Sequence, residues 1–182
     1  MEIETYLVIP ASHEPEGLAD FRRRHIHHPG AAFLFHTTLF APFLTLREFE
    51  REGVARLRDL AARTRPFEYH AGSICTFATS SALWLAPTPV APFEKLTQDL
   101  HDAFPQLPRG AGYPTYHMTI ALTASPDELP PIVREFGAEF GDRLPFRFTC
   151  GELSVYVGED DSYQLHSTYP LGGDALLTPQ TN

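Results

Sequence analysis

The chain contains few cysteines and no long hydrophobic run, and these absences exclude several classes of protein. Its two cysteines, Cys75 and Cys150, form neither a CxxC pair nor a disulfide framework, which fits a reducing compartment. Apolar runs such as residues 31–35 and 82–86 are far shorter than the roughly 18 residues that span a bilayer. The start of the chain is acidic, and its apolar stretch at residues 6–9 is too brief for a signal peptide. We therefore expect a cytoplasmic protein with no membrane partner.

Basic residues are also in short supply. The chain has 14 Lys and Arg against 23 Asp and Glu, which gives a formal net charge of −9. A chain this acidic repels a polyphosphate at long range, so duplex DNA is not an expected partner. A small anion or one end of a nucleic acid remains a suitable ligand if a few basic groups gather in one cleft. Neither a P-loop nor a GxGxxG motif is present, so no cofactor is predicted.

Hydrophobic residues are abundant enough for one folded domain. They make up 43% of the 182 residues, and aromatic residues make up 12%, which excludes disorder as the main state. Proline is frequent, with 17 residues, nearly twice its average usage of roughly 5%. We expect many short elements with firm ends.

Hydrophobic periodicity and turn residues predict an α+β fold. Ser12 is the predicted N-cap of the first helix, and a proline or glycine follows most elements. The predicted helices cover residues 13–26, 46–63, 90–104 and 127–140. The predicted strands cover residues 5–9, 32–40, the interrupted segment 67–86, 116–122, 146–157 and 162–169.

The order of elements occurs twice along the chain. A helix, a strand, a second helix and then strands are found in each half, and the apolar centres Trp84 and Leu165 each lie 48 residues after a histidine of the middle strand. This repetition predicts a single bilobal domain over residues 1–171, in which antiparallel sheets flank a central cleft. The lobes would span 11–88 and 89–171, with strand 5–9 able to join the second lobe. Residues 172–182 are predicted to be a loose C-terminal tail.

The chemistry is predicted to lie in two matching motifs, one on each middle strand. His36-Thr37-Thr38-Leu39 and His117-Met118-Thr119-Ile120 share the pattern His-x-Thr followed by an aliphatic residue. Residues i and i+2 of a strand project from one face, so each motif presents an imidazole beside a hydroxyl. On the second strand, the face that carries the histidine has polar and small side chains, whereas the alternate positions are apolar. Such a face is typical of a strand that lines a cleft.

Two imidazoles across a cleft are suited to phosphodiester chemistry without a metal. In-line displacement at phosphorus needs one proton removed from the incoming oxygen and another delivered to the departing oxygen. Histidine can hold either protonation state near neutral pH, since its ordinary pKa is about 6.5. The hydroxyls of Thr38 and Thr119 can donate to the non-bridging oxygens and stabilise the charge that develops there.

The paired motifs resemble those of the 2H (two-histidine) phosphoesterase superfamily, in its 2′-5′ RNA ligase and cyclic phosphodiesterase branch. The similarity covers nearly the whole chain: residues 36–43 resemble the first motif with its Pro-aromatic follow-on, and residues 67–85 resemble the segment ahead of the second half. The resemblance implies a bilobal α+β fold and metal-free action on 2′,3′-cyclic phosphates or 2′-5′ linkages of nucleotides or RNA ends. In hydrolysis it implies that His117 is the base and His36 the acid, and in ligation the roles exchange.

The sequence departs from the family pattern at two places. Phe35 and Tyr116 stand where many members have proline. Residues 121–122 are Ala-Leu, although many members carry a basic residue shortly after the second motif. Arg109 is the predicted replacement for that cation. Tyr113 and Phe77 are further candidates for substrate binding, because aromatic rings can stack on a base.

The sequence also offers three other interpretations. The segment with His25, His27 and His28 offers imidazoles that could bind a metal, although a solvated loop is the favoured interpretation and no metal site is predicted. Residues 22–24 are three arginines that could attract phosphate, although we interpret them as a solvated helix face. The alternative to an enzyme is a non-catalytic nucleotide or RNA-end binding protein that retains the cleft. A monomer is the expected state.

Overall fold

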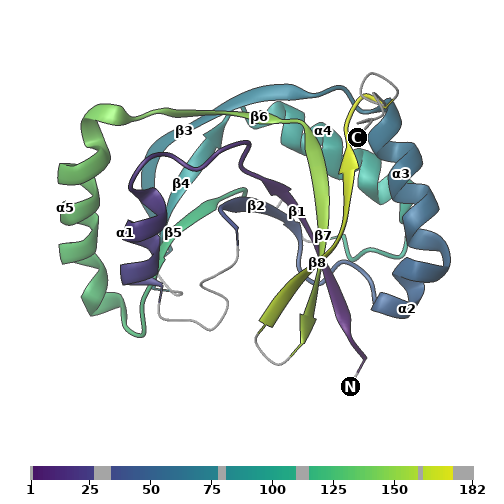
Figure 1. Ribbon diagram of the computed structural model, residues 1–182, viewed down its shortest axis with the longest axis horizontal. Coiled ribbons are helices and arrows are strands. Elements are labelled where there is room, and N and C mark those ends of the chain that lie inside the picture. The colour runs from purple at the N-terminus through teal and green to yellow at the C-terminus, as the bar shows by residue number, and fades with distance from the viewer. Residues whose placement is uncertain (1, 27–33, 78–80, 110–114, 160–161, 174–182) are drawn as a thin grey trace, which may run out of the picture.

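One antiparallel sheet of eight strands forms the centre of the molecule (Figure 1). The computed structural model describes residues 2–26, 34–77, 81–109, 115–159 and 162–173. The strand order is β6-β3-β4-β5-β2-β1-β7-β8, and every neighbouring pair is antiparallel. The strands are β1 (Glu4–Pro10), β2 (His36–Phe40), β3 (Phe67–Thr76), β4 (Ala82–Thr88), β5 (Met118–Leu122), β6 (Phe146–Cys150), β7 (Glu152–Glu159) and β8 (Ser162–Pro170).

Helices pack on the sheet in two groups (Figure 1). One group is α1 and α5, joined by Phe21, whose ring centroid lies 5.3 Å from that of Phe136 and 5.6 Å from that of Phe140. The other group contains α3 and α4 at the opposite end of the view. The helices are α1 (Leu18–His25), α2 (Leu46–Glu48), the π-helical turn η2 (Phe49–Gly53), α3 (Val54–Arg63), α4 (Ala91–Ala103) and α5 (Leu129–Phe140), with short 3₁₀ turns η3 (Pro126–Glu128) and η4 (Gly141–Arg143).

The predicted α+β class is confirmed, with helices and antiparallel strands in the expected order. The predicted helix at 46–63 is continuous through α2, η2 and α3. It begins at a capping box, in which Thr45 Oγ1 accepts from the Glu48 amide and the Glu48 carboxylate accepts from the Thr45 amide. No helix of the described ranges is both long and apolar enough to cross a membrane.

The first helix is shorter than its predicted range of 13–26. Gly17 has φ +80°, a left-handed conformation that cannot lie inside a right-handed helix, so α1 starts at Leu18. Ser12 was the predicted N-cap, but its Oγ instead accepts a hydrogen bond from the Thr149 amide at 3.1 Å. The chain from Pro10 to Gly17 therefore runs across β6 before the helix begins.

The strands of the two predicted lobes are interleaved in the sheet. The range 11–88 supplies β3 and β4 to one half of the sheet and β2 to the other, and the range 89–171 likewise supplies β5 and β6 to one half and β7 and β8 to the other. The first strand pairs with β2 on one side and β7 on the other. The two halves of the sheet therefore do not correspond to two halves of the sequence. Of the predicted tail at 172–182, only Gly172 and Gly173 lie within the described residues.

Candidate active site

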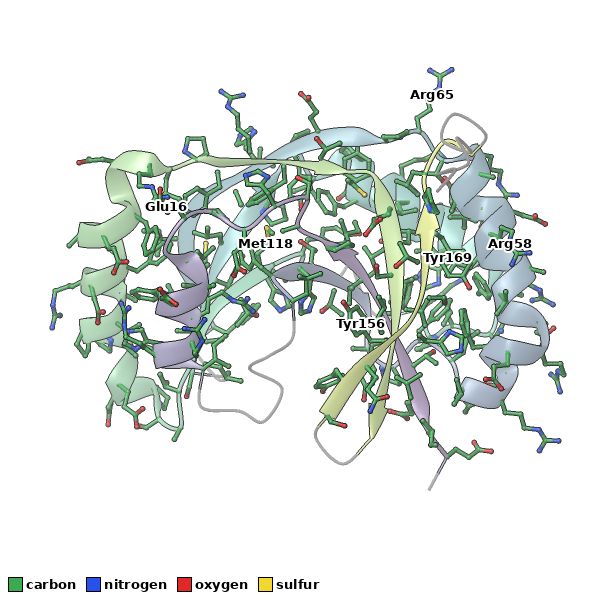
Figure 2. The ribbon with its side chains drawn as sticks, in the orientation of Figure 1. Glu16, Arg58, Arg65, Met118, Tyr156 and Tyr169 are labelled. Carbon is green, nitrogen blue, oxygen red and sulfur yellow. The ribbon has the colours of Figure 1, made fainter. Side chains whose placement is uncertain are left out.

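The two halves of the sheet meet where β2 lies beside β5. Thr37 pairs with Met118 in this antiparallel ladder, and both residues are fully buried. Continuing the register by one residue in each direction sets His36 opposite Thr119 and Thr38 opposite His117. These four side chains share the face away from Thr37 and Met118. Figure 2 labels Met118 near the middle of the molecule, where the two motifs lie side by side.

Each imidazole is held by the same backbone contact. Nδ1 of His117 lies 2.7 Å from the carbonyl oxygen of Thr115, and Nδ1 of His36 hydrogen-bonds the carbonyl oxygen of Leu34. A carbonyl can only accept, so Nδ1 of each ring carries the proton. Nε2 of the neutral ring is then the nitrogen that can accept a proton. The two motifs are thus equivalent in position, orientation and tautomer.

A pocket of about 330 Å³ lies over this face of the sheet. Arg22 of α1 and Ile26, the residue after that helix, line it, together with residues of four strands and Ala41. The lining residues from the strands are Tyr6, Val8, His36, Thr38, Thr119, Leu122 and Tyr163. The pocket is large enough for a phosphate and the sugar attached to it, and three of the four motif side chains contribute directly to its wall.

Burial lowers the pKa of His36 to about 4. Removal of the ring from water is the largest cause, and electrostatic interactions with Arg22 and with His117 lower the pKa further, against the opposing effect of the Leu34 carbonyl. His36 is therefore neutral at pH 7 in the unliganded protein. The influence of His117 on His36 also shows that the two imidazoles lie close enough to interact.

Aromatic rings surround His117. The Phe77 ring stacks on Trp84, with centroids 4.8 Å apart and planes at 24°, and meets the His117 ring edge-on at 5.1 Å. The ring centroid of Trp84 lies 6.0 Å from that of His117, and Trp84 pairs with Thr119 in the ladder between β4 and β5. These contacts restrict the orientation of the His117 ring.

Two tyrosines contribute to the wall of the pocket. The rings of Tyr6 on β1 and Tyr163 on β8 contact each other edge-to-face, with centroids 5.2 Å apart. Their strands are separated by β7, and Gly158 of β7 pairs directly with Tyr163. A Cβ on Gly158 would lie 2.6 Å from Cε2 of Tyr6. The rings can therefore meet across β7 because a glycine lies beneath them.

Comparison with known proteins assigns the family. A profile of the 2′-5′ RNA ligase superfamily matches residues 9–162, a range that contains both His-x-Thr motifs. The chain belongs to the 2′-5′ RNA ligase superfamily. The resemblance indicated by the two motifs is therefore confirmed.

Individual proteins share sequence or fold with this chain. A curated Bacillus cytotoxicus protein, whose name provisionally calls it a phosphoesterase, is 26% identical over 140 residues, which cover 75% of this chain and 78% of that protein. The structure of E. coli LigT complexed with 3′-AMP matches with a TM-score of 0.61 and 14% identity, over 94% of this chain and 99% of LigT. A Thermus thermophilus protein matches with a TM-score of 0.62 and 14% identity, over 96% of this chain and 100% of that one. The curved sheet is thus shared with other structures at low sequence identity.

Arg22 lines the pocket of this member of the 2′-5′ RNA ligase superfamily, although it is not among the site residues predicted from the sequence. The expectation of a solvated helix face holds for Arg23 and Arg24, whose side chains are 72% and 49% exposed, but it is wrong for Arg22, at 9%. Leu18, Phe21 and Arg22 are the buried residues of α1, spaced as i, i+3 and i+4. That spacing was the signal available in the sequence, because position 22 continues the apolar stripe.

The tentative substrate-binding residues have different positions. Phe77 lies against His117, whereas Arg109 is exposed and is not among the described residues that line the pocket. Tyr113 lies outside the described residues. Their roles stay predictions.

In the histidine-rich segment, the described side chain of His25 contacts a carboxylate and an aromatic ring. His25 Nε2 lies 3.2 Å from the Glu135 carboxylate, and the His25 ring packs on Phe21. His27 and His28 lie outside the described residues. Within the described ranges, no group of three His, Cys, Asp or Glu side chains is arranged to hold a metal ion.

Proposed function

We propose that this protein is a metal-independent phosphodiesterase, or reversible ligase, that acts on 2′,3′-cyclic phosphates or 2′-5′ phosphodiester linkages of nucleotides or RNA ends. The observation that carries the proposal is the pairing of the two His-Thr motifs across β2 and β5, with Nδ1 of each imidazole bonded to a carbonyl two residues earlier. Membership of the 2′-5′ RNA ligase superfamily supports a phosphoesterase or ligase role.

The reaction needs two proton transfers at one phosphorus. In hydrolysis of a cyclic phosphate, water attacks phosphorus and a P–O bond to the ribose breaks. One imidazole takes the proton of the attacking water, and the other gives a proton to the departing ribose oxygen. The product is a nucleoside monophosphate, and the reverse sequence closes the cyclic phosphate again and releases the water. The diagonal placement of His36 and His117 suits groups that must act on opposite sides of one phosphate.

The low pKa of His36 defines what substrate binding must do. A ring with a pKa of about 4 is neutral at pH 7 and must gain a proton before it can act as the acid. A bound phosphate is negative and raises the pKa of an imidazole beside it, which offsets the effect of Arg22. We assign the acid role in hydrolysis to His36 and the base role to His117, in line with the family resemblance.

The hydroxyls and the tyrosines complete the proposed substrate site. Thr38 and Thr119 would donate to the non-bridging oxygens, since both line the pocket beside His36. Tyr6 and Tyr163 offer an apolar wall for a sugar or base, and aromatic rings bind bases by stacking. A nucleotide substrate is further supported by LigT, whose structures include complexes with 3′-AMP and ATP. We also propose that the enzyme acts as a monomer in the cytoplasm, where its free thiols Cys75 and Cys150 would stay reduced.

Hydrolysis of 2′,3′-cyclic AMP in the presence of EDTA tests the proposal. We expect turnover by the wild-type protein, and a loss of about 10²–10⁴-fold in kcat for His36→Ala and for His117→Ala, because each variant lacks one proton-transfer group. His70→Ala is the matched control, since His70 lies on β3 in a separate surface pocket. Product formation is followed by chromatography, and thermal unfolding confirms that each variant is folded.

Two results would contradict this function. Turnover that EDTA abolishes and zinc restores would exclude the metal-free mechanism. Binding of the cyclic nucleotide without turnover, even by the wild-type protein, would instead identify a non-catalytic nucleotide or RNA-end binding protein that retains the cleft.

A further inference from the structure

Arg22 is a buried cation in the wall of the pocket, and its side chain is only 9% exposed. It shares the pocket with His36, Thr38 and Thr119. Neither neighbouring arginine on α1 shares this position: Arg23 pairs with Asp20 on the same helix, and Arg24 pairs with two glutamates of α5. Arg22 thus differs from them in burial and in surroundings, although the three are consecutive.

The guanidinium of Arg22 contacts both motif segments. Its Nε donates to the backbone carbonyl of Thr119 at 3.2 Å, and its Cζ lies 5.1 Å from the ring centroid of Phe35, the residue before His36. One contact comes from the second motif and the other from the chain entering the first. The planar group is therefore positioned beside the junction of β2 and β5, between the two motif segments.

Keeping the Arg22 guanidinium charged costs free energy, because burial removes it from water. Glu14 Oε1 lies 3.4 Å from Nη1, which is long for a charge-assisted hydrogen bond, and the Glu14 side chain is 35% exposed. Burial lowers the pKa of Arg22, and this effect outweighs the opposing effect of Glu14. Arginine nevertheless stays protonated in proteins. A buried charge of this kind is stabilised when an anion enters the pocket.

We propose that Arg22 is a phosphate-binding residue of this site, and that its guanidinium donates to a non-bridging oxygen of an anion held between His36 and His117. The assignment to a reacting phosphodiester rests on the proposed function, whereas the anion site itself does not. Arg22 supplies from α1 the positive charge that residues 121–122, Ala-Leu, do not provide after the second motif. The ligand class is a phosphate mono- or diester.

The test compares Arg22→Met and Arg22→Lys with Arg23→Gln. Methionine keeps much of the side-chain volume without the charge, and the Glu14 carboxylate that loses its partner is 35% exposed to water. The probes are inorganic phosphate, measured by NMR titration of the histidine ring signals, and 2′,3′-cyclic AMP, measured by turnover. Arg22→Met should weaken phosphate binding and lower kcat/KM by about 10- to 100-fold, the size of one lost charge-assisted hydrogen bond.

Arg22→Lys should lie between the wild type and Arg22→Met, because an ammonium retains the charge but not the planar fork. Arg23→Gln should match the wild type in both measurements, since its side chain is exposed outside the pocket. If Arg22→Met does not fold, Arg22→Lys decides: unchanged phosphate affinity and turnover in that variant would overturn the proposal.

The outcomes separate this inference from the proposed function. Phosphate binding that depends on Arg22, without turnover of the cyclic nucleotide, would support the anion site and overturn the enzymatic proposal. Turnover that depends on His36 and His117 but is unchanged in folded Arg22→Met would overturn the inference alone. Failure of the wild-type protein to bind inorganic phosphate at millimolar concentration would likewise overturn it.

Discussion

Two backbone carbonyls determine the tautomer of both imidazoles. Leu34 and Thr115 each lie two residues before a motif histidine, and each accepts the proton on Nδ1. Because the contact is local, it depends only on the conformation of the three residues that enter each strand. The same short pattern therefore gives the same ring orientation twice, without help from distant parts of the chain.

The low pKa of His36 makes a prediction about stability. The pKa is about 4 in the folded protein and 6.5 ordinarily, so between these values the unfolded chain binds a proton that the folded protein does not. The free energy of unfolding should therefore rise as the pH is raised from 4 to 6.5. The same increment should disappear when the pH is lowered again. Between pH 7 and pH 5, the titration of His36 should change the free energy of unfolding by about 2 kcal/mol.

Urea unfolding at these two pH values measures this effect. His36→Gln removes the titrating group, so its stability should fall less between pH 7 and pH 5 than that of the wild type, by about 2 kcal/mol. His70→Gln controls for the loss of an imidazole elsewhere. An equal fall in the wild type and in His36→Gln would show that His36 is not held neutral by the fold.

Residue patterns predicted the motifs but not the whole site. His36, Thr38, His117 and Thr119 could be identified because a repeated His-x-Thr pattern on strands is visible without coordinates. Arg22 was assigned to a solvated face because charge usually indicates exposure. Its position on the stripe with Leu18 and Phe21 outweighed its charge, since the stripe faces β5 and the pocket.

At the scale of elements, β7 brings β1 and β8 together around the pocket. Tyr6 on β1 reaches Tyr163 on β8 over a position where β7 has no side chain. Gly158 thus shapes the pocket wall through the two tyrosines, although it is not itself one of the lining residues. The three strands have to be considered together, because none of them forms this aromatic pair alone.

Substitution of Gly158 tests that arrangement. The added Cβ of Gly158→Ala would lie 2.6 Å from Tyr6 Cε2, so the ring has to move. We expect a several-fold rise in KM for a cyclic nucleotide and a loss of stability of about 1–3 kcal/mol from overpacking. Steady-state kinetics and urea unfolding measure the two effects.

Gly151→Ala is the matched control, because a Cβ at Gly151 meets nothing within 4 Å. Its KM and stability should stay close to those of the wild type. An unchanged KM in Gly158→Ala would indicate that the tyrosine wall does not contact the substrate.

Helix prediction succeeded where the local signals agreed. The range 46–63 has an apolar stripe and a capping box at its start, so the helix from α2 to α3 is specified by neighbouring residues. The range 13–26 has a stripe but also Pro15 and Gly17, and the left-handed conformation of Gly17 ends the possibility of a longer helix. Helix boundaries at glycine depend on a dihedral angle that the residue type allows but does not dictate.

At the scale of the whole molecule, we expect the net charge to restrict its partners. Arg65 lies at the upper edge of the view in Figure 2 and Arg58 lies on α3 at its right side, and the chain as a whole has a net charge of −9. The buried cation Arg22 lies in the pocket instead. A ligand that places one phosphate in the pocket gains this attraction, whereas a long duplex also meets the repulsion of the acidic surface.

A duplex and a cyclic-phosphate end should therefore be distinguished by fluorescence anisotropy. We expect no binding of a labelled DNA duplex at low salt and micromolar protein, where non-specific binders with Kd of roughly 10⁻⁴–10⁻⁶ M begin to respond. A labelled single-stranded RNA that ends in a 2′,3′-cyclic phosphate should bind the inactive His117→Ala variant and be displaced by 2′,3′-cyclic AMP. Salt-sensitive duplex binding would contradict this prediction.

The sequence by itself determined the α+β class, the continuous helix at 46–63, and the two His-Thr pairs, because these follow from periodicity and from residues close in the chain. Only the tertiary structure decided which strands are neighbours. The strands of the two predicted lobes are interleaved, so that β2 lies beside β5 and β1 lies between β2 and β7. This arrangement gathers Tyr6, Arg22, His36 and Thr119 around one pocket. The pairing of distant strands depends on the burial of their faces across the whole sheet, and no local pattern contains that information.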